Sequence, residues 1–315
     1  MSQDGFEVGE ACSLFGYSRQ AYYQNKKDHI EYLRRESRII TAAREIRDED
    51  PGISTYKVWL MIKDMFDSGW VPGRDSFYNL MYRYGLRLPT AKPRTTTNSN
   101  HRYRTYKNLI VNFVPLAPNQ LWVADITYID CEEESCYLHL LTDAYSHKII
   151  GWCLATSLEA VHTIEALQMA LRECPLTDFS GLIHHSDRGS QYCSNGYTNI
   201  LKELGVQISM TEDYNPTNNA IAERVNGIIK TEVIYREKRF ATVEQARERI
   251  GRFITFYNER RPHMSIGYQT PNVAHQQTGE QKRMWKKKTY PSCRNEEKVL
   301  SLQPETITEE VSVQP

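Results

Sequence analysis

Three acidic residues, far apart in the sequence, lie in segments that could direct them to one point. Asp125 interrupts the apolar run "LWVADITYI", Asp187 follows "SGLIHHS", and Glu223 lies in "NNAIAERVNGIIKTE". A charge inside a buried strand is costly unless it is paired or bound to a metal. Converging carboxylates need cations between them, and hard oxygen ligands favour Mg²⁺ or Mn²⁺. Two such ions about 3.5–4 Å apart can activate an attacking oxygen and stabilise the leaving oxygen of a phosphodiester.

The segment that carries Glu223 reads as a helix with two distinct faces. At about 100° per residue, Glu223, Asn226 and Lys230 share the polar face, whereas the Ile and Val residues gather on the opposite face. The apolar face would pack on a sheet and leave a carboxylate, an amide and an ammonium in a row. The alternative is a solvent-facing Glu–Lys pair on an ordinary surface helix.

The elements that must position these residues begin near residue 121. Three β-rich runs come first, and the turn "YSHK" joins the second to the third. Helices and strands then alternate, which favours an α/β fold with a mixed sheet and helices on its faces. We predict strands at 121–129, 136–144, 149–157, 180–187 and 207–211, and helices at 158–174, 196–206, 218–235 and 242–261.

The first 90 residues read as helical. Residues 8–28 predict a helix-turn-helix, with Gly16 in the turn and Ser18 as the N-cap of the second helix, whose first residue is Arg19. Any pair of antiparallel helices has a similar pattern, so DNA contact through Arg19 is one of two interpretations. Further helices are predicted at 30–49, 54–66 and 75–88, the last two forming a second pair of this kind.

Charge is unevenly distributed although the chain has no net formal charge. Residues 1–107 hold 18 Lys and Arg against 13 Asp and Glu, residues 108–235 hold 6 against 16, and residues 236–315 hold 15 against 10. Basic flanks of this kind suit a polyanion, and an acidic centre suits cations; chance unevenness is the alternative. Residues 83–107 contain seven cations and no acid, so this segment is predicted to lie on phosphate, unless it is a merely solvated linker. The candidate contacts there are Arg94, Arg102 and Arg104.

Several classes of protein are disfavoured. No run of 18 apolar residues indicates a membrane span, and the N-terminus lacks the pattern of a signal peptide. The seven Cys are scattered, and no Cys/His spacing indicates a zinc site, so we expect reduced thiols in the cytoplasm. The 20 Tyr show no arrangement typical of a tyrosine recombinase. Asp143 is interpreted as the cap of the hairpin turn, and His184 and His185 as structural residues at a strand end.

The acidic motifs together resemble a known family. "WVADITYI", "HHSDRGSQY" and "NNAIAERVNGIIKTE", with 35 residues between Asp187 and Glu223, are similar to bacterial insertion-sequence transposases of the DDE class, the IS-three-type OrfB proteins with a retroviral-integrase-like core. "FYNERRPHMSIGYQTP" and the N-terminal "CSLFGYSRQAYY" also match, so the resemblance covers nearly the whole chain. It implies a ribonuclease-H-like mixed sheet flanked by helices and preceded by a helix-turn-helix region.

The resemblance also implies roles for residues. Asp125, Asp187 and Glu223 become the catalytic ligands of two Mg²⁺ or Mn²⁺ ions, which cleave DNA at the ends of the element and join a freed 3′-OH to another phosphodiester. Lys230 falls where relatives keep a basic residue near terminal DNA. Arg224 stands where relatives often have Ser, so its contact with DNA is an expectation of its own. The further candidate DNA contacts are Arg188, Gln191, Asn219 and His263.

The implied partners are double-stranded DNA, both terminal inverted repeats and target, and a second copy of the chain. Members of this family commonly act as a frameshifted fusion with an upstream partner, OrfA; no long zipper heptad is evident here. We expect a bacterial, nucleoid-associated cytoplasmic protein. Two other functions stay open: a DNA-binding repressor without catalysis, and a nuclease that cuts without joining. The domains expected are 1–50 and 51–90 (helical, DNA-binding-like), 91–110 (basic linker), 111–278 (catalytic core) and 279–315 (tail).

Overall fold

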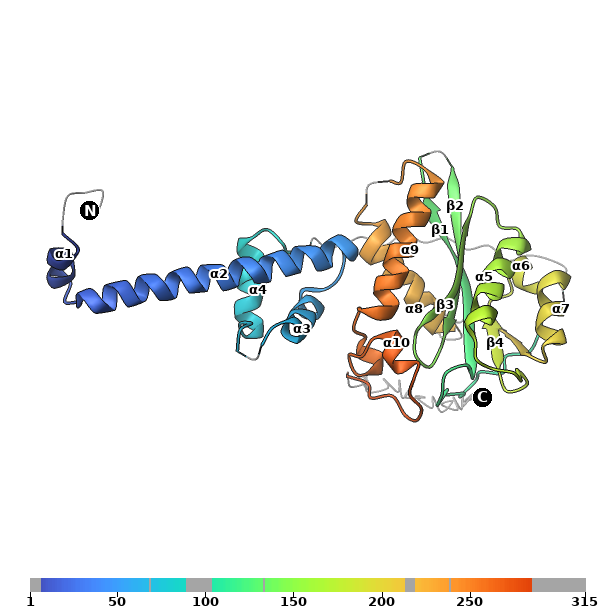
Figure 1. Cartoon of the computed structure of the whole chain (residues 1–315). Helices are drawn as coiled ribbons and strands as arrows, with labels where there is room; N and C mark the ends of the chain where they lie inside the picture. Colours follow the sequence, from blue (N-terminus) through green and yellow to red (C-terminus); the bar gives the residue numbers. More distant parts are fainter. Residues whose placement is uncertain are drawn as a thin grey trace, which may run out of the picture. The chain divides into compact units, whose positions relative to one another are not determined.

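The computed structural model describes residues 7–67, 69–88, 104–132, 134–212, 219–237 and 239–284 (Figure 1). The chain divides into two compact units, 1–284 and 285–315. The second unit, which holds most of the expected tail, falls outside the described residues, as does the part of the expected basic linker at 91–103.

A five-stranded mixed sheet forms the centre of the fold, in the order β3-β2-β1-β4-β5. The first three strands pair antiparallel as a meander, and the last two run parallel to β1. This confirms the mixed sheet expected from the three β-rich runs and the alternation that follows. The strands are β1 (Leu121–Asp130), β2 (Ser135–Asp143), β3 (Ile149–Ala155), β4 (Ile183–Ser186) and β5 (Gln207–Met210).

Helices cover both faces of this sheet (Figure 1). One face packs on α8 and α9 through a core that includes Leu138, Leu140 and Ile228. The other face packs on α5 and α7, with Trp122 and Leu167 in a second core. The helices of the core are α5 (Ala160–Glu173), α6 (Ser190–Cys193), α7 (Asn195–Glu203), α8 (Ala220–Ile229), the π-helical turn η2 (Lys230–Ile234), α9 (Val243–Glu259), the 3₁₀ turn η3 (Met264–Ile266) and α10 (Pro271–Ala274).

The helical region before the core contains α1 (Val8–Leu14), α2 (Arg19–Glu49), α3 (Thr55–Met65) and α4 (Arg74–Arg83). Gly16 takes a positive φ of 73° in the turn, and the Ser18 hydroxyl accepts a hydrogen bond from the amide of Ala21, so the expected turn and N-cap are confirmed. The expected break between 28 and 30 is wrong. Neither Gly nor Pro occurs within Arg19–Glu49, and a single helix of 31 residues results.

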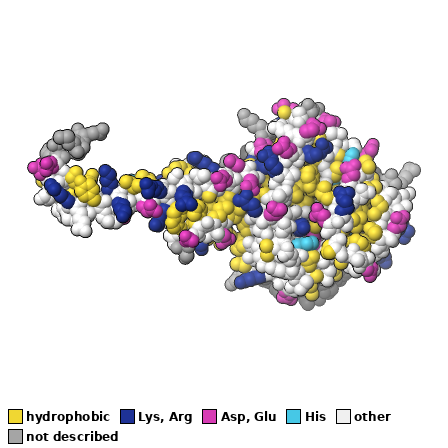
Figure 2. Space-filling view, viewed as in Figure 1, with side chains coloured by type: hydrophobic (Ala, Val, Ile, Leu, Met, Phe, Trp, Pro, Cys, Tyr) yellow, Lys and Arg dark blue, Asp and Glu magenta, His cyan; other side chains and the backbone are white. Residues whose placement is uncertain are grey.

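The first half of α2 differs from its second half. All the buried side chains of α2 lie between Glu36 and its C-terminal end. The apolar ones among them pack with α3 and α4 in one core that also contains Phe256 of α9. Figure 2 shows Lys and Arg side chains beside hydrophobic ones along the exposed part of this region. The exposed hydrophobic residues there include Leu14, Phe15 and Tyr23.

A buried ionic network holds the end of α2 against the core. Arg261 donates two hydrogen bonds to Glu232 of η2, at 2.7 and 2.6 Å, and lies 3.6 Å from Asp50. Burial lowers the pKa of the neighbouring Lys57 to about 8. A β-carbon on Gly52 would stand 2.1 Å from the Cα of Glu232, so only glycine fits this approach. We call Asp50, Lys57, Glu232 and Arg261 the buried ionic network.

Within the described residues, no helix is both long and apolar enough to span a membrane.

Candidate active site

Strands β1 and β4, neighbours in the middle of the sheet, bring Asp125 and Asp187 close together. The strands run parallel, and Val123 of β1 pairs with His185 of β4. Each Asp lies two residues beyond this pair, so both return to the same face of the sheet. Neighbouring strands are separated by about 4.7–4.9 Å, which makes the two carboxylates neighbours. The negative charge of Asp187 raises the pKa of Asp125, as expected for two carboxylates that lie close together.

Asp125 is held in a fixed orientation by two donors. Its Oδ1 accepts a hydrogen bond from the amide of Ile126 at 2.9 Å, and its Oδ2 accepts one from the Asn226 side chain at 2.7 Å. Burial, followed by the negative charge of Asp187, raises the pKa of Asp125 to about 7; Glu223 adds to the rise. A cation bound nearby would favour the ionised form and reverse this rise.

Asp187 begins a tight turn into α6. Its Oδ1 accepts a hydrogen bond from the amide of Gly189 at 2.9 Å. A β-carbon on Gly189 would lie 3.0 Å from that same oxygen and 2.9 Å from Oε1 of Gln191. Gly189 therefore leaves space beside the carboxylate, a role that the Asp-Arg-Gly-Ser sequence did not lead us to assign.

Glu223 comes from the first turn of α8. It lies three residues before Asn226, which contacts Asp125, so the two side chains share one face of the helix. Burial raises the pKa of Glu223, although its side chain is largely exposed. The π-helical turn η2 begins at Lys230 directly after α8. Insertions of this kind occur often at functional sites.

The donor set fits hard divalent cations. Every side-chain ligand among the three candidates is a carboxylate oxygen, the type that Mg²⁺ and Mn²⁺ prefer. Among the described residues, the three acids do not bring one oxygen each within 4.8 Å of one another.

Asn219 and His263, two further candidate DNA contacts, are both buried. The Asn219 side chain is buried and donates a hydrogen bond to the carbonyl of Ala124, the residue before Asp125, at 3.2 Å. It positions the strand. His263 is buried against Tyr257 and Arg261, and burial lowers its pKa well below the usual value. Both side chains are turned into the protein, and contact of either residue with DNA stays a prediction.

The remaining candidate DNA contacts are at least partly accessible where the structure describes them. Arg224 and Arg104 are exposed, and Arg188, Gln191 and Lys230 are partly buried. Arg104 lies 5.4 Å from the ring centre of Tyr106. Arg94 and Arg102 lie outside the described residues.

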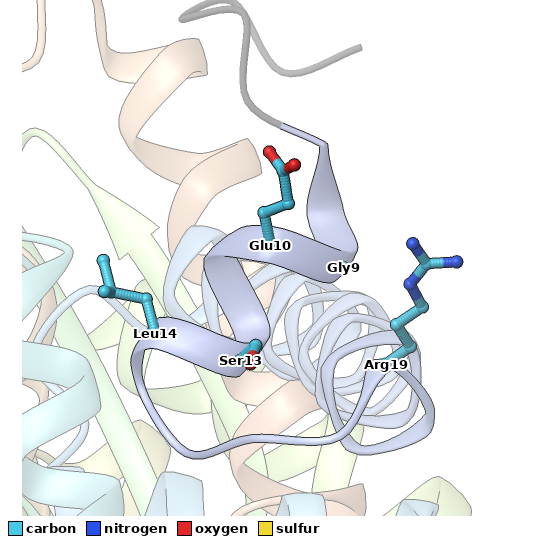
Figure 3. Close-up of a pocket in the computed structure, with 5 residues that line it drawn as sticks. All are labelled: Gly9, Glu10, Ser13, Leu14 and Arg19. Atoms are coloured by element: carbon cyan, nitrogen blue, oxygen red, sulfur yellow. The ribbon is translucent and has the colours of Figure 1, made fainter.

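Arg19 lines a shallow hollow at the turn between α1 and α2 (Figure 3). Gly9, Glu10, Ser13 and Leu14 complete its wall, and Arg19 lies 3.8 Å from Glu7. None of the three candidate catalytic acids lines this hollow. Its open, charged surface suits contact with a larger molecule better than enclosure of a small one.

Two structural interpretations of polar residues are confirmed. The Asp143 carboxylate accepts hydrogen bonds from the amides of Asn119 and Ser146, which closes the turn between β2 and β3. His184 lies 2.7 Å from the Tyr197 hydroxyl, and His185 lies 2.8 Å from the Ser209 hydroxyl. These groups support the strands and offer no ligand to the candidate site.

Comparison with known proteins matches this core to a family. Two family models, both described as integrase core domains, match residues 115–216 and 204–271. An uncharacterized 31 kDa protein of insertion element IS600 from Shigella sonnei is 34% identical over 270 residues, which cover 82% of this chain and 95% of that protein. The transposase for insertion sequence element IS629, also from Shigella sonnei, is 31% identical, covering 86% of this chain and 92% of that protein.

This chain belongs to the bacterial insertion-sequence transposases of the DDE class. Its mixed sheet is accordingly that of an integrase core domain, and its activity is DNA transposition. A solved structure titled as the HTLV-2 integrase catalytic core domain in complex with magnesium is 18% identical, with a TM-score of 0.40, and covers 51% of this chain and 99% of that chain.

Proposed function

We propose that this transposase cuts DNA at the ends of its element and joins the freed 3′-OH to a second phosphodiester, using Asp125, Asp187 and Glu223 as ligands of two Mg²⁺ or Mn²⁺ ions. The observation that carries the proposal is the parallel pairing of β1 with β4, which sets Asp125 beside Asp187. The pKa of Asp125, raised to about 7 by burial and by Asp187, supports it, because such a carboxylate gains most from a nearby cation.

The chain's own residues contribute orientation. Asn226 and the amide of Ile126 hold both oxygens of Asp125, and the amide of Gly189 holds Asp187, so the remaining lone pairs keep fixed directions. When bound, divalent ions lower the pKa of the attacking hydroxyl and neutralise charge on the leaving oxygen. Asn219 fixes the backbone just before Asp125. Phosphoryl transfer depends mainly on such positioning and charge neutralisation.

DNA contacts near the site are proposed for Lys230, Arg224, Arg188 and Gln191. Lys230 and Arg224 come from the same helical segment as Glu223, so a strand that reaches the carboxylates passes within reach of both. Their cations would contact phosphates and thereby fix the position of the DNA. Contacts farther along the DNA are proposed for Arg19, Arg94, Arg102 and Arg104.

Two DNA ends must be held at once for joining, so we propose that at least two copies of the chain act together. The boundaries at 50, 90, 110 and 278 remain our proposed domain limits. A fusion with an upstream OrfA partner, which would add a zipper and a further DNA-binding segment, is proposed as an active form. Light scattering, with and without DNA ends, measures the molar mass of the assembly and tests whether at least two copies of the chain act together.

The function is tested with the purified full chain, Mg²⁺ and a labelled duplex that carries one end of the element. We expect nicked strands with a free 3′-OH, followed by joined products that migrate more slowly on a denaturing gel. Omitting the divalent ion should abolish both products and leave DNA binding intact.

Other products would favour the other functions. Nicks that never proceed to joined products indicate a nuclease. A retarded duplex without any nick, at every Mg²⁺ and Mn²⁺ concentration, indicates a DNA-binding repressor. Either result would overturn the proposal.

A further inference from the structure

A second group of metal-ligand side chains lies on β3 and α5. Cys153, His162 and Glu165 each offer one ligand atom, and these three atoms lie within 4.8 Å of one another. The Cys153 Sγ is 3.0 Å from Oε2 of Glu165, and Nδ1 of His162 is 3.8 Å from the same oxygen. None of these residues belongs to the candidate catalytic site.

The fold brings these residues together for simple reasons. His162 and Glu165 are three residues apart in α5, which places them on one face of the helix. Cys153 shares a sheet face with Gly151, two residues earlier. Gly151 approaches α5 so closely that a β-carbon there would stand 2.0 Å from the Ala166 carbonyl oxygen. The side of β3 that faces α5 therefore presents Cys153 to the helix.

The group lies on the face of the sheet opposite Asp125. Cys153 pairs with His139, and His139 pairs with Ile126, the residue next to Asp125. Adjacent residues of a strand point to opposite faces. Any ion held by Cys153 would therefore be separated from the carboxylate site by the thickness of the sheet.

The orientation of the His162 ring favours its use as a ligand. Its Nε2 lies 3.1 Å from the Ser157 hydroxyl oxygen, so an Nε2–H can donate to Ser157. The Nδ1 lone pair is then directed to the side of Glu165 and Cys153. Metal-binding histidines almost always donate their other ring N–H in this manner, because the bond fixes both the tautomer and the ring.

The spacing of the three atoms fits a tetrahedral zinc site. With Zn–S of about 2.3 Å and Zn–N and Zn–O of about 2.0–2.2 Å, tetrahedral ligand atoms lie roughly 3.4–3.6 Å apart. Two of the three distances, 3.0 and 3.8 Å, lie on either side of this range, and the third is at most 4.8 Å, so changes of side-chain torsion could bring all three atoms onto one ion. Three protein ligands leave the fourth position for water.

We propose that Cys153, His162 and Glu165 bind one Zn²⁺ ion or a transition-metal ion of similar softness. Binding exchanges the proton of the Cys153 thiol for the metal and releases it to water. A soft thiolate and an imidazole distinguish this group from the all-oxygen catalytic site, which selects Mg²⁺ or Mn²⁺. The bound ion would tie the edge strand β3 to α5. The alternative is a thiol that simply donates a hydrogen bond to Glu165.

Cobalt provides the direct test, because Co²⁺ takes zinc sites and gives a thiolate-to-metal absorption band. Tag-free full-length protein is titrated with Co²⁺ in excess Mg²⁺, which fills the carboxylate site. We expect a band that saturates at one equivalent and disappears when Zn²⁺ is added. Cys153→Ser should lose the band, and Cys174→Ser, a change at another partly buried thiol, should keep it.

Further variants keep the proposal falsifiable. Should circular dichroism show that Cys153→Ser is unfolded, the exposed Glu165→Gln takes its place and should weaken Co²⁺ binding at least about tenfold, as should Ser157→Ala. An Asp187→Asn protein should keep the whole band, because the catalytic site is separate. Absence of any thiolate band in the unaltered chain, or an unchanged band in folded Cys153→Ser, would overturn the proposal.

Discussion

Glu223, in the first turn of α8, and Glu232, in the π-helical turn that follows, belong to two groups of acidic side chains with different counter-charges. Burial raises the pKa of Glu232, but the charge of Arg261 outweighs this effect and lowers the pKa to about 2. At the candidate catalytic site, burial and the acids Asp187 and Glu223 raise the pKa of Asp125 to about 7. The strongest charges acting on Asp125 are thus negative, whereas those acting on Glu232 include a buried cation.

The difference shows what each group does. The buried ionic network supplies its own cations and joins the helical region to the core. Around Asp125, in the middle of the sheet, the charges of Asp187 and Glu223 are repulsive and raise its pKa. Such a group is suited to cations taken from solution. Mutations in the two groups should therefore affect different properties of the transposase.

The largest effect is expected for Asp187→Asn. Losing a carboxylate ligand removes several kcal/mol of transition-state stabilisation, which corresponds to a loss on the order of 10³-fold or more in cleavage and joining. DNA binding should persist, because phosphate contacts supply most of it. Gel assays of products, with a mobility shift on the same samples, check both points. Joining at the unaltered rate would contradict the assignment of Asp187.

Arg261→Met tests the other group. It leaves Glu232 and Asp50 buried without their guanidinium, which costs about 3–5 kcal/mol of folding stability. Denaturant unfolding measures the loss. The matched control is Arg252→Met, an exposed residue paired with Glu248, which should change stability by less than about 1 kcal/mol. Equal stability of the two variants would show that the buried ionic network is not structural.

In the absence of divalent ions, Asp125→Asn should increase folding stability, whereas Arg261→Met decreases it. The folded-state pKa of Asp125, about 7, exceeds the ordinary value of 3.8, so the native state binds more protons between these values and its stability falls as pH rises from about 4 to 7. Asn removes this slope and stabilises the protein at pH 8 by on the order of 4 kcal/mol, from a shift of about 3 pKa units. Unfolding curves at pH 4 and 8 measure it. A slope that survives in Asp125→Asn would exclude Asp125 as its source.

The smallest effect is expected for Lys230→Ala, which separates contact with DNA from catalysis by the neighbouring acids. Loss of one phosphate contact should weaken binding to the DNA ends and reduce the slope of log affinity against log salt by about 1. Arg252→Ala serves as a control with equal loss of charge. A salt slope that falls equally in both variants would argue against a specific role for Lys230.

Much of the fold could be predicted from local sequence. The apolar run around Asp125 and the turn at Asp143 carry strong strand and turn signals, and both were confirmed. The break expected near residue 29 was wrong because a change in charge pattern does not end a helix without a Gly, Pro or cap. The burial of the Asn219 and His263 side chains could not be predicted, since neither residue reveals in sequence that its side chain turns inward.

The site was predictable only in part, for a physical reason. Asp125 is conspicuous because it interrupts an apolar strand, and Asp187 and Glu223 could be chosen because their motifs and the 35 residues between them resemble the family. Groups formed across elements give no such signal. Cys153 and His162 are nine residues apart and meet only because β3 and α5 pack together. The buried ionic network likewise joins Asp50 to Arg261 across most of the chain.

The central claim is that Asp125, Asp187 and Glu223 together hold divalent ions from solution. Crystals of the full chain soaked in Mn²⁺ and measured for anomalous scattering test this most directly. We predict two anomalous peaks about 3.5–4 Å apart, both in contact with oxygens of these three side chains. Fully occupied Mn²⁺ elsewhere in the transposase, with none at Asp125 and Asp187, would contradict it.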